Sequence, residues 1–296
     1  MIVACTGASG FVGRHLVARL TAGGHRVRVL TRDPGRLPFA ADTVDVVRGD
    51  LADRQALAAL LRGADAVVHL VGIIVEVGAQ TFQTVHVDGT RAVIDVARAA
   101  GVRRYVHMSA AGARGDAGAT AYHRTKWEAE SLVRAAGLAH AVIRPTLVAG
   151  PENVPMQLLA RLHRLLPAVP MFGDGAFPME PVWVGDVAEA FTRAVERSEL
   201  VGEWDVGGPD RVTYRRFVEG IGRAVGRPRP VLSLPLAAVR LAASTMDLLP
   251  GGLAPITSDQ LQMLLEGSVA QDNAIERVFG IRPIGFDEAL RRSLVP

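Results

Sequence analysis

Three side chains near the middle of the chain have types and a spacing that suit proton transfer. Tyr122 and Lys126, in the sequence YHRTK, are four residues apart, so a helix would place both on one face. A free phenol has a pKa of about 10, and a neighbouring ammonium group lowers that pKa by stabilising the phenolate. Ser109 precedes them and is expected at the carboxyl end of a strand. We predict Tyr122 as the acid–base group, Lys126 as its electrostatic partner and Ser109 as the anchor of a substrate carbonyl.

The use of lysine in this chain supports that prediction. Lys126 is the only lysine among 33 basic residues, and all the others are arginine. This suggests that the position needs a compact ammonium group, although chance would give the same count. The same ammonium could bind a ribose hydroxyl, so Tyr122 and Lys126 are also expected to contact a cofactor. An ordinary helix with a tyrosine and a lysine one turn apart is the alternative.

A glycine-rich stretch near the N-terminus predicts a dinucleotide site. The apolar run Ile2–Cys5 is typical of a buried parallel strand, and the residues after Gly10 have the apolar spacing of an amphipathic helix. Gly7, Gly10 and Gly13 would permit a tight turn, close approach of a pyrophosphate and tight helix packing, with the phosphates facing the helix N-terminus. The residues predicted to bind the dinucleotide here are Gly7, Ser9, Gly10, Phe11, Val12 and Gly13.

The end of the second strand bears on the choice between NAD(H) and NADP(H). The strand predicted at 26–31 ends at Thr31, where an NAD-binding protein usually has an acidic residue, about 20 residues after the glycines. Thr31 is instead followed by Arg32, whose guanidinium could pair with a ribose 2′-phosphate. Asp33 is interpreted as a turn residue before Pro34, although its carboxylate keeps NAD(H) open. We therefore expect NADP(H) rather than NAD(H).

Another cofactor contact is expected after the third strand. Asp50 and Leu51 follow the strand predicted at 44–47, at the edge of the sheet where ligands collect. Asp50 could accept a hydrogen bond from an adenine amino group. Its alternative role is to cap the helix predicted at 54–61, although Asp53 is better placed for that.

Strands and helices alternate over the first half of the chain. Further strands are predicted at 66–70, 104–108 and 139–143, and further helices at 81–100 and 122–134. This alternation is typical of an α/β fold with a doubly wound parallel sheet. We predict a nucleotide-binding domain at 1–150, with elements returning near 180–206, and a smaller, mainly helical substrate domain at 151–296. Within that domain, helices are predicted at 185–197, 213–225, 235–248 and 257–266, and a short strand at 204–206.

The composition argues against several other classes of protein. The formal net charge is only +3 and the arginines form no block, so no nucleic-acid partner is expected. Cys5 is the only cysteine and the first strand begins at residue 2, so we expect no internal disulfide, no signal peptide and a reducing, cytoplasmic location. Pro235, Arg240 and Asp247 interrupt the apolar stretch 231–249, so no transmembrane segment is predicted. The eight histidines are scattered, and no metal site is predicted.

The motifs together resemble the extended or atypical short-chain dehydrogenase/reductase superfamily. They are TGASGFVG at 6–13, GDL at 49–51, Ser109, YHRTK at 122–126, RPTLVAGP at 144–151, PVWVGDVAEA at 181–190 and VGGP at 206–209. The stretches LVGI at 70–73, VHVDGT at 85–90 and ITSDQ at 256–260 are most similar to one branch. That branch contains the NADPH-binding accessory subunit of respiratory complex I and bacterial proteins labelled sugar-nucleotide epimerases.

The resemblance implies a Rossmann fold, bound NADP(H) and a Ser-Tyr-Lys triad at Ser109, Tyr122 and Lys126. It also adds Val71, His86 and Pro145 to the expected cofactor contacts.

His86 departs from the pattern of the superfamily, because active members often have asparagine there in an N-V-x-G-T motif. An imidazole can also carry protons, but the usual proton relay would be altered. We expect an NADP(H)-dependent oxidoreductase or sugar-nucleotide epimerase. The alternatives are a non-catalytic nucleotide-binding structural or assembly protein, in contact with respiratory machinery or the membrane periphery, and an NADP(H)-sensing module.

The nature of the substrate depends on a group of apolar residues between 156 and 183. They are Met156, Met171, Phe172, Phe177, Met179 and Trp183. Most are interpreted as core. If two or three of them line a pocket, the expected partner is a small-molecule substrate with an apolar body rather than a nucleotide sugar.

Overall fold

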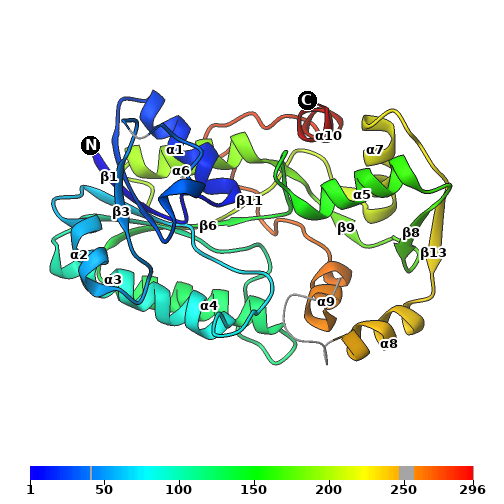
Figure 1. Cartoon of the computed structure of the whole chain (residues 1–296), viewed down its shortest axis with the longest axis horizontal. Coiled ribbons are helices and arrows are strands. Elements are labelled where there is room, and N and C mark those ends of the chain that lie inside the picture. The colour runs from blue at the N-terminus through cyan, green and yellow to red at the C-terminus, as the bar shows by residue number, and fades with distance from the viewer. Residues whose placement is uncertain (41, 247–256, 296) are drawn as a thin grey trace.

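The computed structural model describes residues 1–40, 42–246 and 257–295, and a seven-stranded sheet forms its centre (Figure 1). Neighbouring strands in this sheet are parallel, in the order β11-β6-β5-β4-β1-β2-β3. The strands are β1 (Ile2–Thr6), β2 (Arg26–Thr31), β3 (Asp45–Arg48), β4 (Ala66–His69), β5 (Arg104–Met108), β6 (Ala139–Pro145) and β11 (Gly202–Val206). The order reverses beside β1, and ligands bind at such a reversal in open parallel sheets. The predicted doubly wound α/β fold is confirmed.

Helices cover both faces of this sheet (Figure 1). One face carries α1 (Phe11–Ala22) and α6 (Val184–Glu196), and the other carries α2 (Arg54–Leu61), α3 (Gly89–Ala99) and α4 (Ala121–Ala135). Leu16 of α1 and Leu57 of α2 are fully buried against opposite sides of the sheet. Because both faces are covered, central strands such as β4 are buried along their whole length and consist of short, nearly continuous apolar runs.

The region before α3 differs from the prediction. The bounds of β2, β5 and α2 are as predicted, but the expected helix at 81–100 begins as a π-helical turn, η2 (Gln83–Asp88), and continues as α3. Near its start the Thr84 hydroxyl donates a hydrogen bond to the carbonyl of Ala79 over 3.1 Å, and such side-chain bonds compete with regular helical pairing. Short π-helical turns are frequent at functional sites. This turn carries His86.

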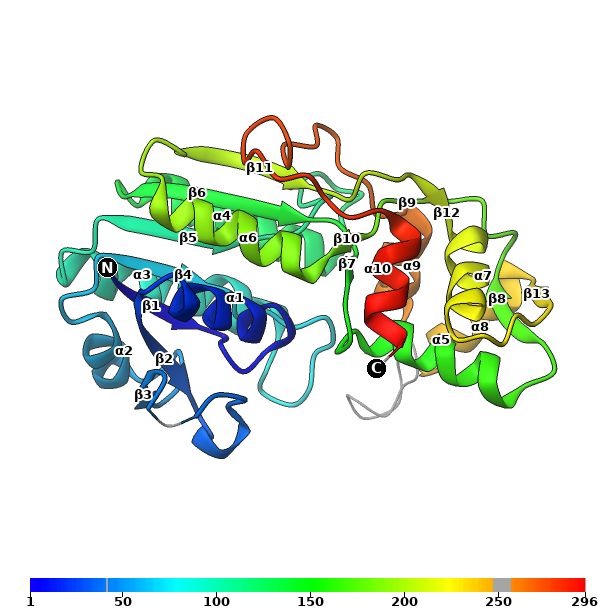
Figure 2. The same ribbon diagram turned by 90° about the horizontal axis from the view of Figure 1, so that it is seen from above.

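The chain beyond residue 150 places a second group of elements at the carboxyl ends of the central strands (Figure 2). Its other helices are α5 (Val154–Leu165), α7 (Tyr214–Ala224), α8 (Leu236–Met246), α9 (Ser258–Glu266) and α10 (Phe286–Leu294). Its short strands are β7 (Val148–Ala149), β8 (Val169–Phe172), β9 (Pro178–Met179), β10 (Val182–Trp183), β12 (Val212–Thr213) and β13 (Val231–Leu234). β7 pairs with β10, β8 with β13 and β9 with β12, so this part contains more strand than the sequence predicted.

Two of these helices, α5 and α10, were not predicted, whereas α6, α7 and α9 lie within one residue of their predicted bounds. Pro151 and Pro155, which flank the start of α5, were interpreted as punctuation of an irregular segment. Asn153 nevertheless caps this helix by accepting a hydrogen bond from the Met156 amide at 2.9 Å. The end of the helix predicted at 235–248 and residue 256 of the ITSDQ stretch lie outside the described residues. Within the described ranges, no helix is both long and apolar enough to cross a bilayer.

Candidate functional site

The loop after β1 leaves no room for side chains. Gly7 has a φ of 78°, and a Cβ atom there would lie 3.1 Å from the Val71 amide nitrogen, which follows β4. A Cβ atom on Gly13 would lie 2.1 Å from the Gly7 carbonyl oxygen. Glycine is therefore required at both positions, the first for the left-handed turn and the second for the close packing of α1 on the loop.

The N-terminus of α1 faces this loop with unused hydrogen-bond donors. Gly10 is the N-cap residue, no side chain caps the helix, and its first turn has no acidic residue. The first amides of a helix have no partner within it and carry a partial positive charge, so this end is suited to binding a phosphate. The sequence reasoning missed Arg14, whose guanidinium lies 3.4 Å from the Ser9 carbonyl oxygen and is paired with the Glu152 carboxylate at 3.4 Å.

Phe11 and Val12 can contribute to this loop in different ways. The side chain of Val12 is buried in the core under α1, so only its backbone amide can contact a ligand. The ring of Phe11 packs against Gly150, where a Cβ atom would lie 2.6 Å from the ring. Phe11 therefore joins the glycine loop to the segment that follows β7.

Within the described ranges, Arg32 at the end of β2 has no ion pair, whereas the carboxylate of Asp33 beside it has partners. Arg32 is exposed. The Asp33 carboxylate accepts a hydrogen bond from the Gly35 amide at 3.0 Å and lies 3.9 Å from Arg36, and so it caps the short 3-10 helix η1 (Pro34–Arg36). This is the turn role that the sequence suggested for Asp33.

Asp50 and Leu51 both have structural roles after β3: Asp50 is exposed and stabilises a turn, and Leu51 packs on α3. The Asp50 carboxylate is exposed and accepts hydrogen bonds from the amides of Ala52 and Asp53 at 2.9 and 3.1 Å. Asp53, rather than Asp50, caps α2. Leu51 packs on Gly89, where a Cβ atom would lie 2.6 Å from its side chain. Both amides bond Oδ1 of Asp50, so its Oδ2 atom could accept a hydrogen bond from an adenine amino group.

Lys126 is buried in α4, and its ammonium group points at the end of β5. It donates a hydrogen bond to the Met108 carbonyl over 3.0 Å, and Met108 directly precedes Ser109. Burial lowers the pKa of Lys126 to about 8, and the charge of Glu130 partly opposes this shift. A Cβ atom on Gly72 would lie 2.9 Å from the Lys126 nitrogen, so the loop after β4 passes directly over it.

Tyr122 stands in a cluster of aromatic rings. Its ring centroid lies 5.9 Å from that of Phe82, 5.5 Å from that of His86 and 5.4 Å from that of His123. Burial raises the pKa of Tyr122 to about 12, whereas the sequence predicted that Lys126 would lower it. That prediction was wrong for this arrangement, because desolvation of the phenolate dominates and the Lys126 ammonium donates to Met108 instead.

Ser109 has an unused hydroxyl group at the end of β5. It is 2 % exposed, its amide donates to the Ile143 carbonyl at 2.9 Å, and its hydroxyl has no hydrogen-bond partner among the described residues. Buried hydroxyl groups are nearly always paired, so one left unpaired at a strand end is suited to bonding a ligand. Pro145 ends the adjacent strand β6, and its carbonyl accepts from the Ala111 amide at 3.0 Å.

His86 links the loop after β4 to α4. Its Nε2 atom lies 3.1 Å from both the amide nitrogen and the carbonyl oxygen of Ile73, and its Nδ1 atom lies 2.9 Å from the Thr125 hydroxyl. Burial, with a further contribution from the charge of Lys126, lowers the pKa of His86 to about 3, so the ring is neutral near pH 7. The tautomer that accepts from the Ile73 amide donates its Nδ1 proton to Thr125. His86 therefore positions the backbone beside the Tyr122 ring.

A second pair of histidines lies beneath this site and was missed by the sequence reasoning. His69 and His107 are fully buried at matching positions of β4 and β5, with their rings stacked at 5.5 Å. His69 bonds the hydroxyls of Thr6 and Thr90 at 2.6 and 3.2 Å, whereas neither ring nitrogen of His107 has a partner among the described residues. The sequence does show a histidine near the end of each of these two apolar runs, which would have predicted that His69 and His107 lie side by side in adjacent strands.

Comparison with known proteins identifies the family. Residues 3–207 match the model of the NAD dependent epimerase/dehydratase family. The chain belongs to this family. Members of this family bind NAD(P). Three or more His, Cys, Asp or Glu side chains that could hold a metal ion do not meet anywhere in the described part of the chain.

Three similar proteins illustrate the range of this family. The chain is 32 % identical over 249 residues to ceramide reductase of Caulobacter vibrioides, covering 83 % of this chain and 77 % of the relative. It is 26 % identical to NADH dehydrogenase [ubiquinone] 1 alpha subcomplex subunit 9 of Arabidopsis thaliana, covering 91 % of this chain and 71 % of the relative. The structure of MoeE5 in complex with UDP-glucose and NAD superimposes with a TM-score of 0.73 at 22 % identity, covering 99 % and 97 % of the two chains.

Proposed function

We propose that the protein is an NADP(H)-dependent oxidoreductase that reduces a carbonyl group. The observation that carries this proposal is the unpartnered hydroxyl of Ser109, which directly follows the residue whose carbonyl binds Lys126. These two groups and Tyr122 come from the end of β5 and from α4. The loop after β4 lies between them and the glycine loop, since Val71 is next to Gly7 and Gly72 is next to Lys126. The bound nucleotide would supply the hydride.

The proposed reaction gives each of the three side chains a role. Tyr122 is protonated near neutral pH, so it would give its proton to the oxygen of the carbonyl that is reduced. Ser109 would donate a hydrogen bond to the same oxygen and hold it in place. Lys126, with a pKa of about 8, is mainly charged at pH 7 and would fix the backbone at Met108 and bind a ribose hydroxyl.

The proposal includes a preference for NADP(H) over NAD(H). Arg32 is exposed at the end of β2 and is available for a 2′-phosphate. Asp33 is committed to its turn through the Gly35 amide, which leaves it poorly placed to accept from a ribose hydroxyl.

The arginines near the site do not favour a nucleotide sugar. A cavity of about 400 Å³ is lined by Gly112, Ala113, Arg114, Arg144, Asp205, Glu266 and Gln271. Arg114 lies 3.0 Å from the Glu266 carboxylate, and Arg144 lies 2.5 Å from that of Glu130, so both charges are already paired. A second diphosphate would have to compete with these acids.

An apolar substrate is favoured instead, and a relative supports this. The name ceramide reductase describes a protein that reduces a lipid, at 32 % identity to this chain. The apolar residues that the sequence singled out do not line the two described cavities; Met156, Met171 and Met179 are buried in the core beside α7. The apolar body would therefore be held by other residues.

A screen of carbonyl compounds tests the proposal. NADPH oxidation would be followed with long-chain aldehydes and ketones, and in parallel UDP-sugars with NAD⁺ would be analysed by chromatography for an epimerised product, because epimerisation consumes no nucleotide. We expect turnover only with the former, and a loss of at least a hundredfold in kcat for Tyr122→Phe. Tyr214→Phe is the matched control, since Tyr214 is buried in the core against Phe177. Turnover that persists in Tyr122→Phe would exclude the proposed proton donor.

The second candidate function is a nucleotide-binding structural or assembly protein. It is favoured by His86 at the usual asparagine position and by the raised pKa of Tyr122, which makes the phenolate hard to form. The Arabidopsis relative named as a subunit of NADH dehydrogenase points in the same direction, including contact with respiratory machinery. NADP(H) that copurifies with the protein, together with no turnover in the screen, would favour this function.

A reducing compartment, such as the cytoplasm, is also part of the proposal. Its support is Cys5, the only cysteine, which is buried inside β1 with the pKa of its thiol raised by burial to about 12. A thiol in this state neither pairs nor reacts readily.

A further inference from the structure

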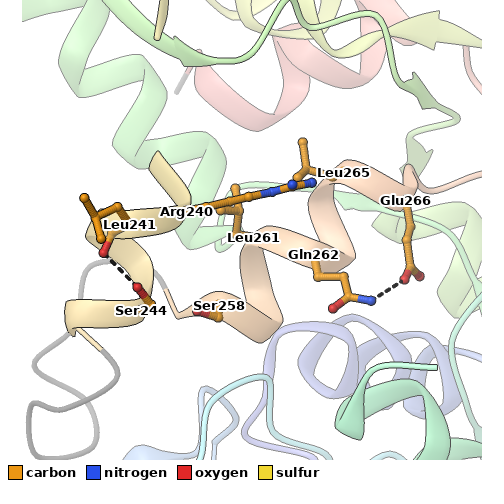
Figure 3. A pocket seen from close by; sticks show the side chains of 8 residues that line it. All are labelled: Arg240, Leu241, Ser244, Ser258, Leu261, Gln262, Leu265 and Glu266. Atoms are coloured by element: carbon orange, nitrogen blue, oxygen red, sulfur yellow. Dashed lines mark hydrogen bonds between the residues drawn. The ribbon is translucent and has the colours of Figure 1, made fainter. Parts of the chain in front are cut away.

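A cavity of about 750 Å³ lies between α8 and α9 (Figure 3). It is lined by Arg240, Leu241, Ser244, Ser258, Leu261, Gln262, Leu265 and Glu266. The leucines give it an apolar surface: Leu261 is 2 % exposed at its wall, and Leu241 is 68 % exposed at its outer edge. Ligand pockets in proteins typically measure about 300–1,000 Å³, so the cavity is large enough for a small molecule.

The helix α9 is attached to the start of α4, where Tyr122 lies. The Asp259 carboxylate accepts a hydrogen bond from the Ala121 amide at 3.2 Å. At the other end of α9, a Glu266 carboxylate oxygen lies 3.6 Å from Nδ1 of His123. Ala121 and His123 are the neighbours of Tyr122, so α9 contacts the Tyr122 helix on both sides of that residue.

Glu266 lines both this cavity and the smaller one near the end of β5. Its carboxylate also lies 3.0 Å from Arg114, five residues after Ser109. The two cavities therefore share Glu266, whose partner Arg114 lines the smaller one. A molecule that occupied both would reach Gly112 and Ala113, in the loop that follows Ser109.

We propose that the cavity between α8 and α9 binds the hydrocarbon chain of the substrate, whose carbonyl end is held at Ser109 and Tyr122; this rests on the proposed function. Leu241, Leu261 and Leu265 supply the apolar contacts. Arg240 extends from α8 across the gap toward α9, with its guanidinium beside Leu265, so its stem covers the space (Figure 3).

The chain length of the substrate gives the first test. A series of straight-chain aldehydes would be assayed with NADPH. Burying one methylene contributes about 0.8 kcal/mol, so KM should fall about fourfold per added methylene until the cavity is filled. A KM that does not change with chain length would overturn the proposal while leaving the oxidoreductase intact.

A pair of leucine variants gives the second test, with binding of cis-parinaric acid measured by fluorescence. Leu241→Glu should weaken this binding at least tenfold, because it places a charge inside the cavity. Leu165→Glu is the matched control, since Leu165 is 71 % exposed on α5 and does not line the cavity. Both variants should bind NADPH as the unaltered protein does. Equal effects of the two variants would refute the assignment.

A variant that fills the cavity with a larger side chain, and sedimentation of the variants, distinguish the remaining outcomes. Gln262→Trp should occupy the cavity from α9 and weaken binding of the fatty acid without introducing a charge. If the fatty acid binds and both cavity variants weaken it, but no aldehyde is reduced, the chain site stands and the oxidoreductase proposal fails. If instead Leu241→Glu changes only the sedimentation of the protein, the cavity belongs to an interface between two copies and the proposal is wrong.

Discussion

Glu130 and Arg144 form a two-bond ion pair that joins α4 to the end of β6. The Arg144 guanidinium donates to the two Glu130 carboxylate oxygens at 2.7 and 2.5 Å, and the Glu130 side chain is completely buried. Arg134 adds a third bond to the same carboxylate at 3.2 Å. Glu130 lies one helical turn after Lys126, so this pair holds the helix that carries Tyr122 and Lys126 in register with the sheet.

Replacement of this carboxylate should therefore destabilise the protein. Glu130→Gln removes the buried charge that Arg144 and Arg134 share, but both arginines keep Glu203 as a partner. We therefore expect a loss below the roughly 3–5 kcal/mol that breaking a buried pair from one side costs. Because the charge of Glu130 raises the pKa of Lys126, the same change should lower that pKa further. Urea unfolding would measure the loss of stability. Glu128→Gln, on the same helix, is the control, and an equal effect of both changes would contradict the assigned role.

The buried ammonium group gives a pH-dependent prediction. Burial lowers the pKa of Lys126 from 10.5 to about 8, so between these pH values the unfolded chain binds a proton that the folded protein has released. Stability that depends on Lys126 must then rise with pH across this window. Relative to Lys126→Met, the unaltered protein should gain about 3 kcal/mol between pH 8 and pH 10.5. Unfolding curves at several pH values would check this, and a constant difference would show that Lys126 is solvated.

Local patterns were sufficient to predict the strands of the central sheet, the glycine loop and most helices, but not the short strand pairs beyond residue 150. The glycines at 7, 10 and 13 limit what the backbone can do, and short apolar runs between turns identify buried parallel strands without knowledge of their neighbours. The sequence also predicted that Ser109 follows a strand and that Tyr122 and Lys126 share a helix, and the structure has β5 and α4 at these positions.

Contacts between residues far apart in the sequence could not be predicted from local patterns. The sequence suggests that Lys126 faces Tyr122, but only the fold places its nitrogen at the Met108 carbonyl and buries it. The bond between Ala121 and Asp259 joins residues 138 positions apart, and no local pattern predicts it. The π-helical turn at His86 likewise depends on hydrogen bonds to the preceding loop. Desolvation, which raises the pKa of Tyr122, is a property of the packed structure alone.

The unpaired histidine beneath the site should make the protein sensitive to acid. Burial lowers the pKa of His107 well below 6.5, and neither ring nitrogen has a partner among the described residues. As pH falls below 6.5 the unfolded chain takes up a proton that the folded protein excludes, so stability is lost. His107→Phe should be as stable as the unaltered protein near pH 7, and its advantage should grow by about 1.4 kcal/mol per pH unit on acidification.

The control for this experiment is Tyr105→Phe. Tyr105 stacks on His107 at 6.3 Å and also has a buried, unpartnered polar atom, but it takes up no proton in acid. Its effect on the free energy of unfolding should therefore be the same at pH 7 and pH 5. A His107→Phe curve parallel to that of Tyr105→Phe would mean that His107 becomes protonated in the folded state.

Arg32 should determine the preference for the phosphorylated nucleotide. A charge-assisted hydrogen bond contributes about 1.5–3 kcal/mol, so Arg32→Ala should weaken NADPH binding by roughly 10- to 150-fold and change NADH binding little. Arg36→Ala is the matched control, because Arg36 lies in the same turn, is exposed, and already pairs with Asp33 at 3.9 Å. Fluorescence titration of both nucleotides with the three proteins would measure the effect. Equal affinity of the unaltered protein for NADPH and NADH would mean that Arg32 does not contact a 2′-phosphate, and tighter binding of NADH would mean that the carboxylate of Asp33 leaves its turn to meet the ribose.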